Sequence, residues 1–375
     1  MSRGHIRRRG VNAWELKFDL STNPRTGKRE TRYHSFRGTR QQAQVKLAEL
    51  IAAAGKGAYV EPSKATVADF VRARVDQWEA AGDISARTAQ RYRQLVENQI
   101  VPHLGTKALQ KLTRLDIEGW HTTLRNDGLA ARTIGHAHRV LSKALSDAER
   151  DGMVVKNICK LQKAPKVAET EMAIVRDVPK LVEKLRGERL YVLAVIALFT
   201  GMRLGEILAL KDERVKLDSG VIEVREALEE TKIHGVRFKS AKTRAGRRDI
   251  TLPTIVSEAL REHRTVLLET RMKLGLGKFK PEDLMFANLE GKPLRPSAVS
   301  SDWGELAERI GIAEITFHGL RHSHASMLVS EGVDIVTISK RLGHARPAVT
   351  LAIYAHMFTS DDSKAAAAVN AALNR

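Results

Sequence analysis

An alternation of apolar and charged residues opens the chain. Trp14, Leu16 and Phe18 share one face of a predicted strand, whereas the residues between them are charged. Turn-forming residues at 23–27 separate this strand from a second one predicted over residues 28–36. Together the two strands indicate a small sheet with one buried face.

A helix is predicted directly after these strands. Thr39 is placed to cap residues 40–54, and Gly55 ends the helix. Residues 1–40 contain eleven Lys and Arg against three Asp and Glu, a local net charge of +8. A basic sheet backed by a helix can lie on a DNA groove, although a solvated strand face would give the same pattern. We interpret residues 1–60 as a DNA-binding domain with five candidate contacts: Arg7, Arg8, Arg9, Lys28 and Arg29.

Helical spacing dominates the next segment of the chain. Residues 61–63 form a predicted linker, and apolar residues then recur at helical intervals from Thr66 to Cys159. A helix predicted over residues 131–151 carries three further candidate DNA contacts on its polar face: Arg132, Arg139 and Lys143. We interpret residues 64–160 as a DNA-gripping bundle. An ordinary bundle with solvated basic residues fits this stretch nearly as well.

The second half of the chain mixes helices with a short strand region. Its longest apolar stretch, residues 190–200, predicts a buried helix and is shorter than the roughly 18 residues that a membrane span needs. Strands are predicted over residues 221–224, 235–239 and 248–252. The last two would form a hairpin, with Lys242 near its tip.

The net charge of the chain indicates which class of molecule it binds. The chain has 63 Lys and Arg against 44 Asp and Glu, which gives a net charge of +19 and a pI of about 10.1. Such a positive field attracts polyanions, and counterion release favours nucleic acid over the alternative, an acidic membrane surface. The basic N-terminus is not followed by an apolar signal core, and the single cysteine, Cys159, fits a reducing compartment. We expect a cytoplasmic protein, associated with the nucleoid when bound to DNA.

Short motifs in the second half carry reactive side chains, and each is weak by itself. Arg203 follows an apolar helix and precedes Glu206 by three residues, which a helix-surface ion pair would also explain. His318 and Arg321 project from the same side of a helical turn, but such pairs occur by chance. No single motif identifies a reaction.

The conjunction of these residues points to a family. Their order along the chain is Arg203, Lys242, His318, Arg321, His344 and Tyr354. The segments TGMRLGEI, SAKTRAGRRDITLP, TFHGLRHSHASML, ISKRLGHA and TLAIYAH resemble the sequence boxes of the tyrosine recombinase (phage integrase) family in composition and spacing. The turn at residues 211–214 departs from the family pattern, which concerns a structural detail and not the catalytic set.

The resemblance implies a role for each reactive residue. Tyr354 would attack the scissile phosphate and form a 3′-phosphotyrosyl link. Arg203 and Arg321 would fork onto the non-bridging oxygens, to which His344 would also donate. His318 would act as the base or the hydrogen-bond partner of Tyr354.

The resemblance also covers supporting residues and cofactors. Lys242 would be the general acid for the departing 5′-hydroxyl, and Glu206 would orient Arg203 or His318. The phosphotyrosyl bond preserves the energy of the ester and the cationic residues supply the charge, so we expect neither ATP, metal nor other cofactor. Three more histidines are interpreted as structural, DNA-adjacent or incidental: His322, His324 and His356.

The family plan implies a mainly α fold with small β-sheets (α+β). Residues 1–60 would be an arm-type DNA-binding domain with a three-stranded sheet plus helix, and residues 64–160 a helical core-binding (SAM-like) domain. Residues 172–375 would be a mixed α/β catalytic domain after a connector over residues 160–171. The helical tail over residues 355–375 would dock on a neighbouring protomer or pack on its own domain.

The expected function is site-specific integration or excision of a phage or other mobile element. The partners would be double-stranded DNA at attachment sites, three further copies of the chain in a homo-tetramer on a Holliday junction, and DNA-bending or directionality proteins. A type IB topoisomerase and a catalytically silent DNA-binding regulator are the alternatives. A metal-dependent nuclease is disfavoured because no carboxylate cluster has metal-ligand spacing.

Overall fold

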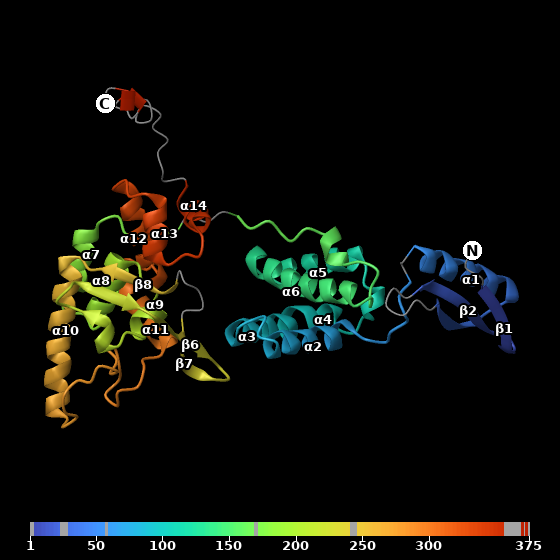
Figure 1. Cartoon of the computed structure of the whole chain (residues 1–375), viewed down its shortest axis with the longest axis horizontal. Coiled ribbons are helices and arrows are strands. Elements are labelled where there is room, and N and C mark those ends of the chain that lie inside the picture. Colours follow the sequence, from blue (N-terminus) through green and yellow to red (C-terminus); the bar gives the residue numbers. More distant parts are fainter. Residues whose placement is uncertain are drawn as a thin grey trace. The chain divides into compact units, whose positions relative to one another are not determined.

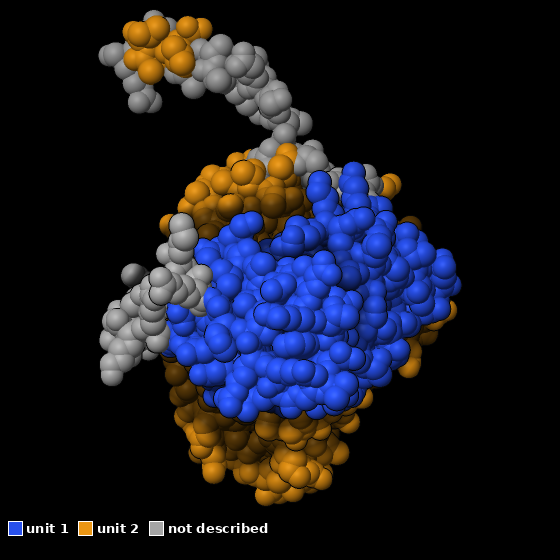
Figure 2. All heavy atoms as spheres, turned by 90° about the vertical axis from the view of Figure 1, so that its right-hand side faces the viewer, with its two compact units in different colours: residues 1–168 blue, residues 169–375 orange. Residues whose placement is uncertain are grey.

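The chain folds into two compact units, Met1–Ala168 and Glu169–Arg375 (Figures 1 and 2). The computed structural model describes residues 4–22, 29–56, 59–168, 172–240, 246–355, 369–370 and 372–373. Several residues singled out in the sequence lie outside this description: Lys28, the side chain of Arg29, Lys242, His356 and most of the tail. No helix within the described ranges is both long and apolar enough to cross a membrane.

The first unit begins with an antiparallel three-stranded sheet of order β1-β2-β3, formed by β1 (Gly4–Gly10), β2 (Ala13–Thr22) and β3 (Arg29–Arg37). Leu16 and Phe18 are fully buried on the face that packs against α1 (Arg40–Gly55). Thr39 caps this helix and forms a capping box with Gln42. The expected sheet plus helix is therefore confirmed, together with the predicted cap.

Sequence reasoning did not locate β1. Its residues, GHIRRRG, lack an apolar alternation because only Ile6 packs towards the core of the sheet and α1. The strand forms through its register with β2, in which Ile6 lies opposite Leu16 and Arg7 opposite Glu15. The arginine-rich segment is thus an edge strand and not an unstructured basic arm.

Short helices form the rest of the first unit around one apolar core, which includes Trp78 and Trp120. They are α2 (Val67–Ala80), α3 (Ala86–Leu95), the π-helical turn η1 (Val96–Ile100), α4 (Val101–Leu104), the 3₁₀ turn η2 (Leu109–Lys111), α5 (Arg114–Asn126), α6 (Ala131–Arg150) and the 3₁₀ turn η3 (Ile158–Leu161). Cys159 is buried in the same core, where burial raises the pKa of its thiol to about 12. A thiol held protonated in this way acts as a small apolar residue.

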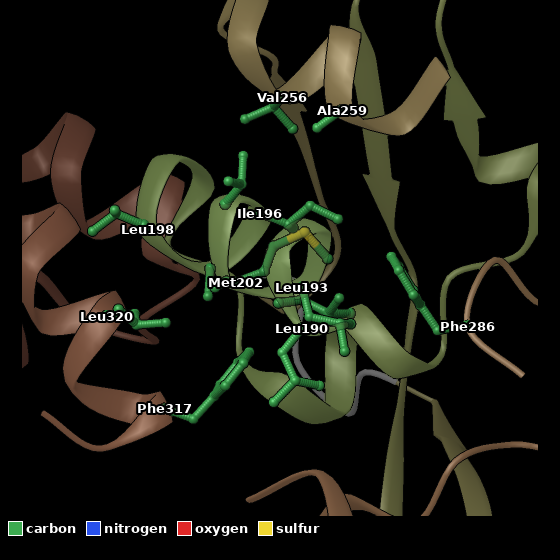
Figure 3. Packing of buried hydrophobic residues seen from close by; sticks show 14 of the residues in the cluster. Leu190, Leu193, Ile196, Leu198, Met202, Val256, Ala259, Phe286, Phe317 and Leu320 are labelled. Carbon is green, nitrogen blue, oxygen red and sulfur yellow. The ribbon is translucent and has the colours of Figure 1, made fainter. Parts of the chain in front are cut away.

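The second unit is built around one apolar helix, α8 (Tyr191–Thr200). The unit also contains α7 (Val178–Leu185), α9 (Leu204–Leu208), the 3₁₀ turn η4 (Asp212–Arg214), α10 (Thr254–Lys273), α11 (Pro296–Arg309), α12 (Phe317–Ser330), α13 (Ile335–Leu342) and α14 (Pro347–Tyr354). All residues from Leu193 to Leu198 are buried, as expected for a helix that is apolar on every side. Figure 3 shows Ile196 and Met202 between Val256 of α10 and Leu320 of α12.

Two small antiparallel sheets correct the predicted strand pairing. One has the order β4-β5-β8, from β4 (Val215–Lys216), β5 (Val221–Val224) and β8 (Arg248–Thr251). The other pairs β6 (Glu226–Thr231) with β7 (Gly235–Ser240). The predicted hairpin between residues 235–239 and 248–252 is therefore wrong, because β7 pairs with β6 and β8 pairs with β5. Sequence reasoning missed β6, whose composition is polar.

Candidate active site

Arg321 of α12 joins two helix ends at the centre of the candidate site. Helices α8 and α13 both end at a glycine in the left-handed conformation, Gly201 (φ 67°) and Gly343 (φ 70°). The Arg321 guanidinium donates through Nη1 to the carbonyl of Gly201 (2.5 Å) and through Nη2 to that of Leu342 (2.8 Å). Carbonyls at helix C-termini favour a cation. These contacts fix the segments that lead into Arg203 and His344.

Gly201 allows this close approach. A Cβ atom at Gly201 would lie 2.6 Å from Cδ2 of His324 and 2.7 Å from a methyl carbon of Leu342, and the positive φ also disfavours other residues there. The ends of α8 and α13 can therefore meet around α12 only with glycine at this cap.

Glu206 holds Arg203 from the first turn of α9. Its carboxylate accepts from the backbone nitrogen and from Nη1 of Arg203, each at 2.9 Å. This is one of the two partners that the sequence suggested for Glu206; the described contacts include none with His318. The Arg203 side chain stays 41 % exposed while that of Glu206 is 8 % exposed, so the arginine is positioned but still open to a ligand.

Arg248 is a further member of this group that sequence reasoning missed. The first residue of β8, it donates to both Glu206 oxygens, through Nη2 at 2.8 Å and Nη1 at 3.2 Å. Burial would raise the pKa of the Glu206 carboxyl, but hydrogen bonding and charge from Arg248 and the charge of Arg203 bring it below its ordinary value. The only sequence signal was the paired arginines before a strand, which do not specify a partner.

Arg248 also connects β8 to the end of α13. Its Nε donates to the carbonyl of Arg341 (2.7 Å), and Nε of Arg341 donates in turn to Nε2 of His324 (3.1 Å). Since that nitrogen accepts, Nδ1 of His324 carries the proton and donates to the carbonyl of Leu198 (3.0 Å). Burial lowers the pKa of His324 to about 3, which is consistent with a neutral structural residue.

Arg321 is a buried cation without an anion of its own. Its residue is 3 % exposed, and it forms no ion pair with a carboxylate among the described residues. Burial lowers its pKa to about 9, and the positive charge of Arg203 acts in the same direction. A desolvated guanidinium with unused N–H donors is suited to bind a phosphate.

His322 is the residue that contacts Tyr354. Nδ1 of His322 lies 2.7 Å from the tyrosine hydroxyl oxygen. The sequence predicts His318 as the base or hydrogen-bond partner of Tyr354, but the described contacts include none between these two residues. The two histidines lie one helical turn apart on α12 with perpendicular rings 4.7 Å apart, and the tyrosine lies beside the second turn.

His318 and His344 lie near the two arginines. His318 is exposed, yet the surrounding protein atoms, Arg321 and Arg203 lower its pKa. Burial and the same two arginines lower the pKa of His344 to about 4, and its Nδ1 lies 2.7 Å from the hydroxyl of Thr350. The site therefore brings together all the described residues of the predicted catalytic set. Lys242 lies outside the described residues.

Tyr354 is sequestered in this structure. Only 2 % of it is exposed, and it belongs to an apolar cluster that includes Ala325, Val329 and Leu342. Burial raises the pKa of its hydroxyl to about 12, although the positive charge of Arg321 opposes the shift. At neutral pH the hydroxyl is therefore protonated and needs an acceptor before it can act as a nucleophile.

The predicted DNA contacts in the first unit differ in their surroundings. Arg132 and Arg139 are exposed on α6. Burial lowers the pKa of nearby His136, and both arginines act in the same direction together with Arg91 of α3, which sequence reasoning missed. Lys143 is instead engaged within the bundle, because its Nζ lies 3.4 Å from the centre of the Trp78 ring. This contact favours a structural role for Lys143.

Three predicted contacts lie on β1. Arg7, Arg8 and Arg9 are all exposed. Arg9 forms a two-pronged ion pair with Glu15 on the neighbouring strand, at 2.8 and 3.0 Å. Arg7 forms no ion pair with a described residue, so it is the more available cation.

Comparisons with known proteins agree with the fold. The model of the phage integrase family matches residues 173–360, and that of the phage integrase N-terminal SAM-like domain matches residues 72–125. An integrase of Streptomyces ambofaciens is 28 % identical over 93 % of this chain and 89 % of its own length. A tyrosine recombinase XerC-like protein of Caldanaerobacter subterraneus is 25 % identical over 74 % of this chain and 75 % of its own.

Solved structures share the fold at lower identity. The Tn1549 transposon integrase in complex with a circular intermediate DNA has a TM-score of 0.69 at 21 % identity, covering 81 % of this chain and 99 % of its own. A lambda integrase tetramer bound to a Holliday junction has a TM-score of 0.55 at 19 % identity, covering 91 % and 96 %. With a family model that spans half of its residues, the chain belongs to the phage integrase family, that is, to the tyrosine recombinases.

Proposed function

We propose that this protein cleaves and rejoins DNA at specific sites through a 3′-phosphotyrosyl intermediate on Tyr354. One observation carries the proposal: Arg321, a buried cation with no carboxylate partner among the described residues, lies in one cluster with the tyrosine and with Arg203. A phosphodiester bound there would supply the missing negative charge. Arg203 and Arg321 would fork onto its non-bridging oxygens, where charge develops in the transition state.

The neutral histidines complete the phosphate site. His344, fixed by Thr350, and His318, beside both arginines, would donate hydrogen bonds to the same oxygens. Glu206 would keep Arg203 in place. The positive charges of Arg203 and Arg321 take the role that a divalent ion has in many nucleases, so we propose a metal-independent reaction. No ATP is needed either, since the phosphotyrosyl bond preserves the energy of the ester.

Lys242 would protonate the departing 5′-oxygen. The proposal rests on its place in the SAKTRAGRRDITLP box, in the segment that leads from β7 to β8. Arg248 ties the beginning of β8 to Glu206, which anchors one end of this segment at the site. A lysine ammonium carries a proton that it can give to a leaving oxygen.

The whole chain would act on attachment sites of a phage or other mobile element. Residues 1–60 would contact arm-type DNA, residues 64–160 would grip the core site and residues 172–375 would catalyse strand exchange. The exposed arginines on β1 and α6 support DNA contact by the first two. Four copies would exchange strands through a Holliday junction, with DNA-bending and directionality proteins as further partners.

Covalent trapping tests this proposal. The protein is incubated with EDTA and a duplex from the boundary of the element, nicked so that the short fragment with the 5′-hydroxyl diffuses away. A protein–DNA adduct should persist on a denaturing gel for the wild type and be absent for Tyr354→Phe. DNA binding without an adduct would favour a silent regulator. An adduct with relaxation of supercoiled DNA, but without strand exchange between two duplexes, would favour a type IB topoisomerase.

A further inference from the structure

We infer that His322, and not His318, accepts the phenolic proton of Tyr354 when the tyrosine oxygen attacks DNA. The inference deepens the proposed function and rests on it. It assigns a catalytic role to a residue whose position beside Arg321 in the sequence gave no indication of one. The geometry of α12 and α14 carries the argument.

The contact between the two side chains is short and well supported. Nδ1 of His322 and the hydroxyl oxygen of Tyr354 are 2.7 Å apart, within the normal range for a hydrogen bond. The tyrosine ring lies in the apolar cluster formed by α12, α13 and α14, which limits its orientations. The packing of the ring therefore keeps the hydroxyl oxygen of Tyr354 next to His322.

Protonation states fix the direction of this hydrogen bond. Burial, together with His318 and Arg321, lowers the pKa of His322 to about 4, so its imidazole is neutral near pH 7. Since the tyrosine remains protonated, its O–H donates and Nδ1 accepts. The titratable and charged groups that face His322 are His318 and Arg321 on α12, Tyr354 on α14, and His344 after α13.

The resulting step is balanced. The O–H bond of Tyr354 breaks as its proton moves to Nδ1 of His322, the tyrosine oxygen bonds to phosphorus, and the bond from phosphorus to the 5′-oxygen breaks. That leaving oxygen takes a proton from a separate acid, proposed above as Lys242. On rejoining, the imidazolium returns its proton to the departing tyrosine. The bound phosphate, negative and close to Arg321, offsets the repulsion between arginine and imidazolium.

His318 is a poorer candidate for this role. Within the described contacts it reaches the tyrosine only through the ring of His322, at 4.7 Å between ring centres. It is exposed, yet the protein atoms around its ring lower its pKa, as do Arg321 and Arg203. Its position suits a donor to the phosphate, whereas that of His322 suits the nucleophile.

Single-turnover cleavage of the nicked duplex tests the inference. The rate constant is measured from about pH 6 to 8, where His322 should remain neutral and the wild-type rate should show no dependence on its titration. His322→Ala should cleave about 10²–10⁴-fold more slowly near pH 7. Its rate should rise roughly tenfold per pH unit because hydroxide must then remove the proton. Added imidazole should partly restore it.

A second variant separates proton transfer from positioning. His322→Asn keeps a polar group near the place of Nδ1 but cannot take up a proton, so it should stay slow and keep the steep pH dependence. Both variants should bind the duplex with unchanged affinity. The matched control is His263→Asn, which alters another partly buried histidine of the same unit, stacked on Phe286 and bonded to the Met285 carbonyl. It should leave rate and pH profile unchanged.

Four results would overturn the inference. If His322→Ala cleaves at the wild-type rate or faster, the contact only holds the DNA-free tyrosine. If His322→Asn restores the rate and the flat pH profile, the residue positions the tyrosine without accepting its proton. If the wild type forms no adduct on verified boundary DNA, the proposed function fails together with the inference. An adduct formed with an unaltered pH profile in both variants overturns the inference alone.

Discussion

Basic and histidine-rich clusters occur in both units, but they are built in opposite ways. In the second unit the arginines are held by the fold: Arg321 is buried against two helix ends, and Arg203 is tied to Glu206. In the first unit Arg132 and Arg139 are exposed on a helix face. A cation that must stabilise a transition state has to be placed before the reaction, whereas one that attracts the DNA backbone needs only to be accessible.

The histidines show the same contrast. His121 and His138 of the first unit are both buried in the bundle, with a ring nitrogen of each 3.1 Å apart. Burial, with charge from His138, lowers the pKa of His121 to about 4, and nothing in the proposed chemistry uses the pair. The pKa of His322 is similarly low, but its hydrogen-bond partner is the proposed nucleophile, Tyr354. A perturbed pKa marks a catalytic residue only when a reacting atom lies within reach.

In the comparison of the two units, the largest expected effect follows from replacing the buried arginine of the second unit. Arg321→Lys should lower the single-turnover cleavage rate by at least about 10²–10³-fold, because an ammonium cannot hold both helix-end carbonyls and still fork onto a phosphate. The matched control is Arg309→Lys, an exposed arginine paired with Glu188, which should cleave normally. Cleavage by Arg321→Lys within a few-fold of wild type would mean that the guanidinium geometry is not essential.

A smaller effect is expected from the buried ion pair that supports Arg203. The side chains of Arg248 and Glu206 are 7 % and 8 % exposed, so removing either partner leaves a buried charge. Arg248→Gln and Glu206→Gln should each lower the free energy of unfolding by about 3 kcal/mol, and the double variant by clearly less than their sum.

Urea denaturation of the four proteins in this cycle measures the coupling between the two residues. The control cycle uses Arg214 and Glu223, a pair in the same unit with 40 % and 24 % exposed side chains, whose coupling should lie between about 0 and 1 kcal/mol. Equal coupling in the two cycles would show that burial does not distinguish the pair that supports the site.

Apolar patterns predicted much of the fold because they depend on local sequence. The alternation around Leu16 and the uninterrupted apolar residues of α8 both mark buried faces, and the structure contains both. Strand β6 could not be found in this way. Its Glu229 is buried only because Arg237 and Lys239 of β7 neutralise it, and a polar strand of this kind is recognisable only with its partner.

The candidate site shows a related limit. The family boxes supplied the candidate reactive residues because those residues lie within short motifs. The choice between His318 and His322 depends on which turn of α12 the end of α14 meets, and the role of Arg248 depends on how β8 approaches α9. Both are tertiary relations between segments far apart in the chain, which the spacing within a motif does not encode.

The smallest effect should come from single arginines on the exposed sheet, where two neighbours differ in their ion pairs. Arg7 forms no ion pair with a described residue, whereas Arg9 is already paired with Glu15. Arg7→Gln should reduce the slope of log affinity against log salt concentration by about 0.9, the value for one lost phosphate contact. Arg9→Gln should change it less, because the carboxylate competes with the phosphate. Titrating the full chain with arm-type DNA at several salt concentrations measures both slopes.

Equal changes in the two slopes would show that the ion pair between Arg9 and Glu15 opens when DNA binds. If neither slope changes, the contact with arm-type DNA lies elsewhere than on β1.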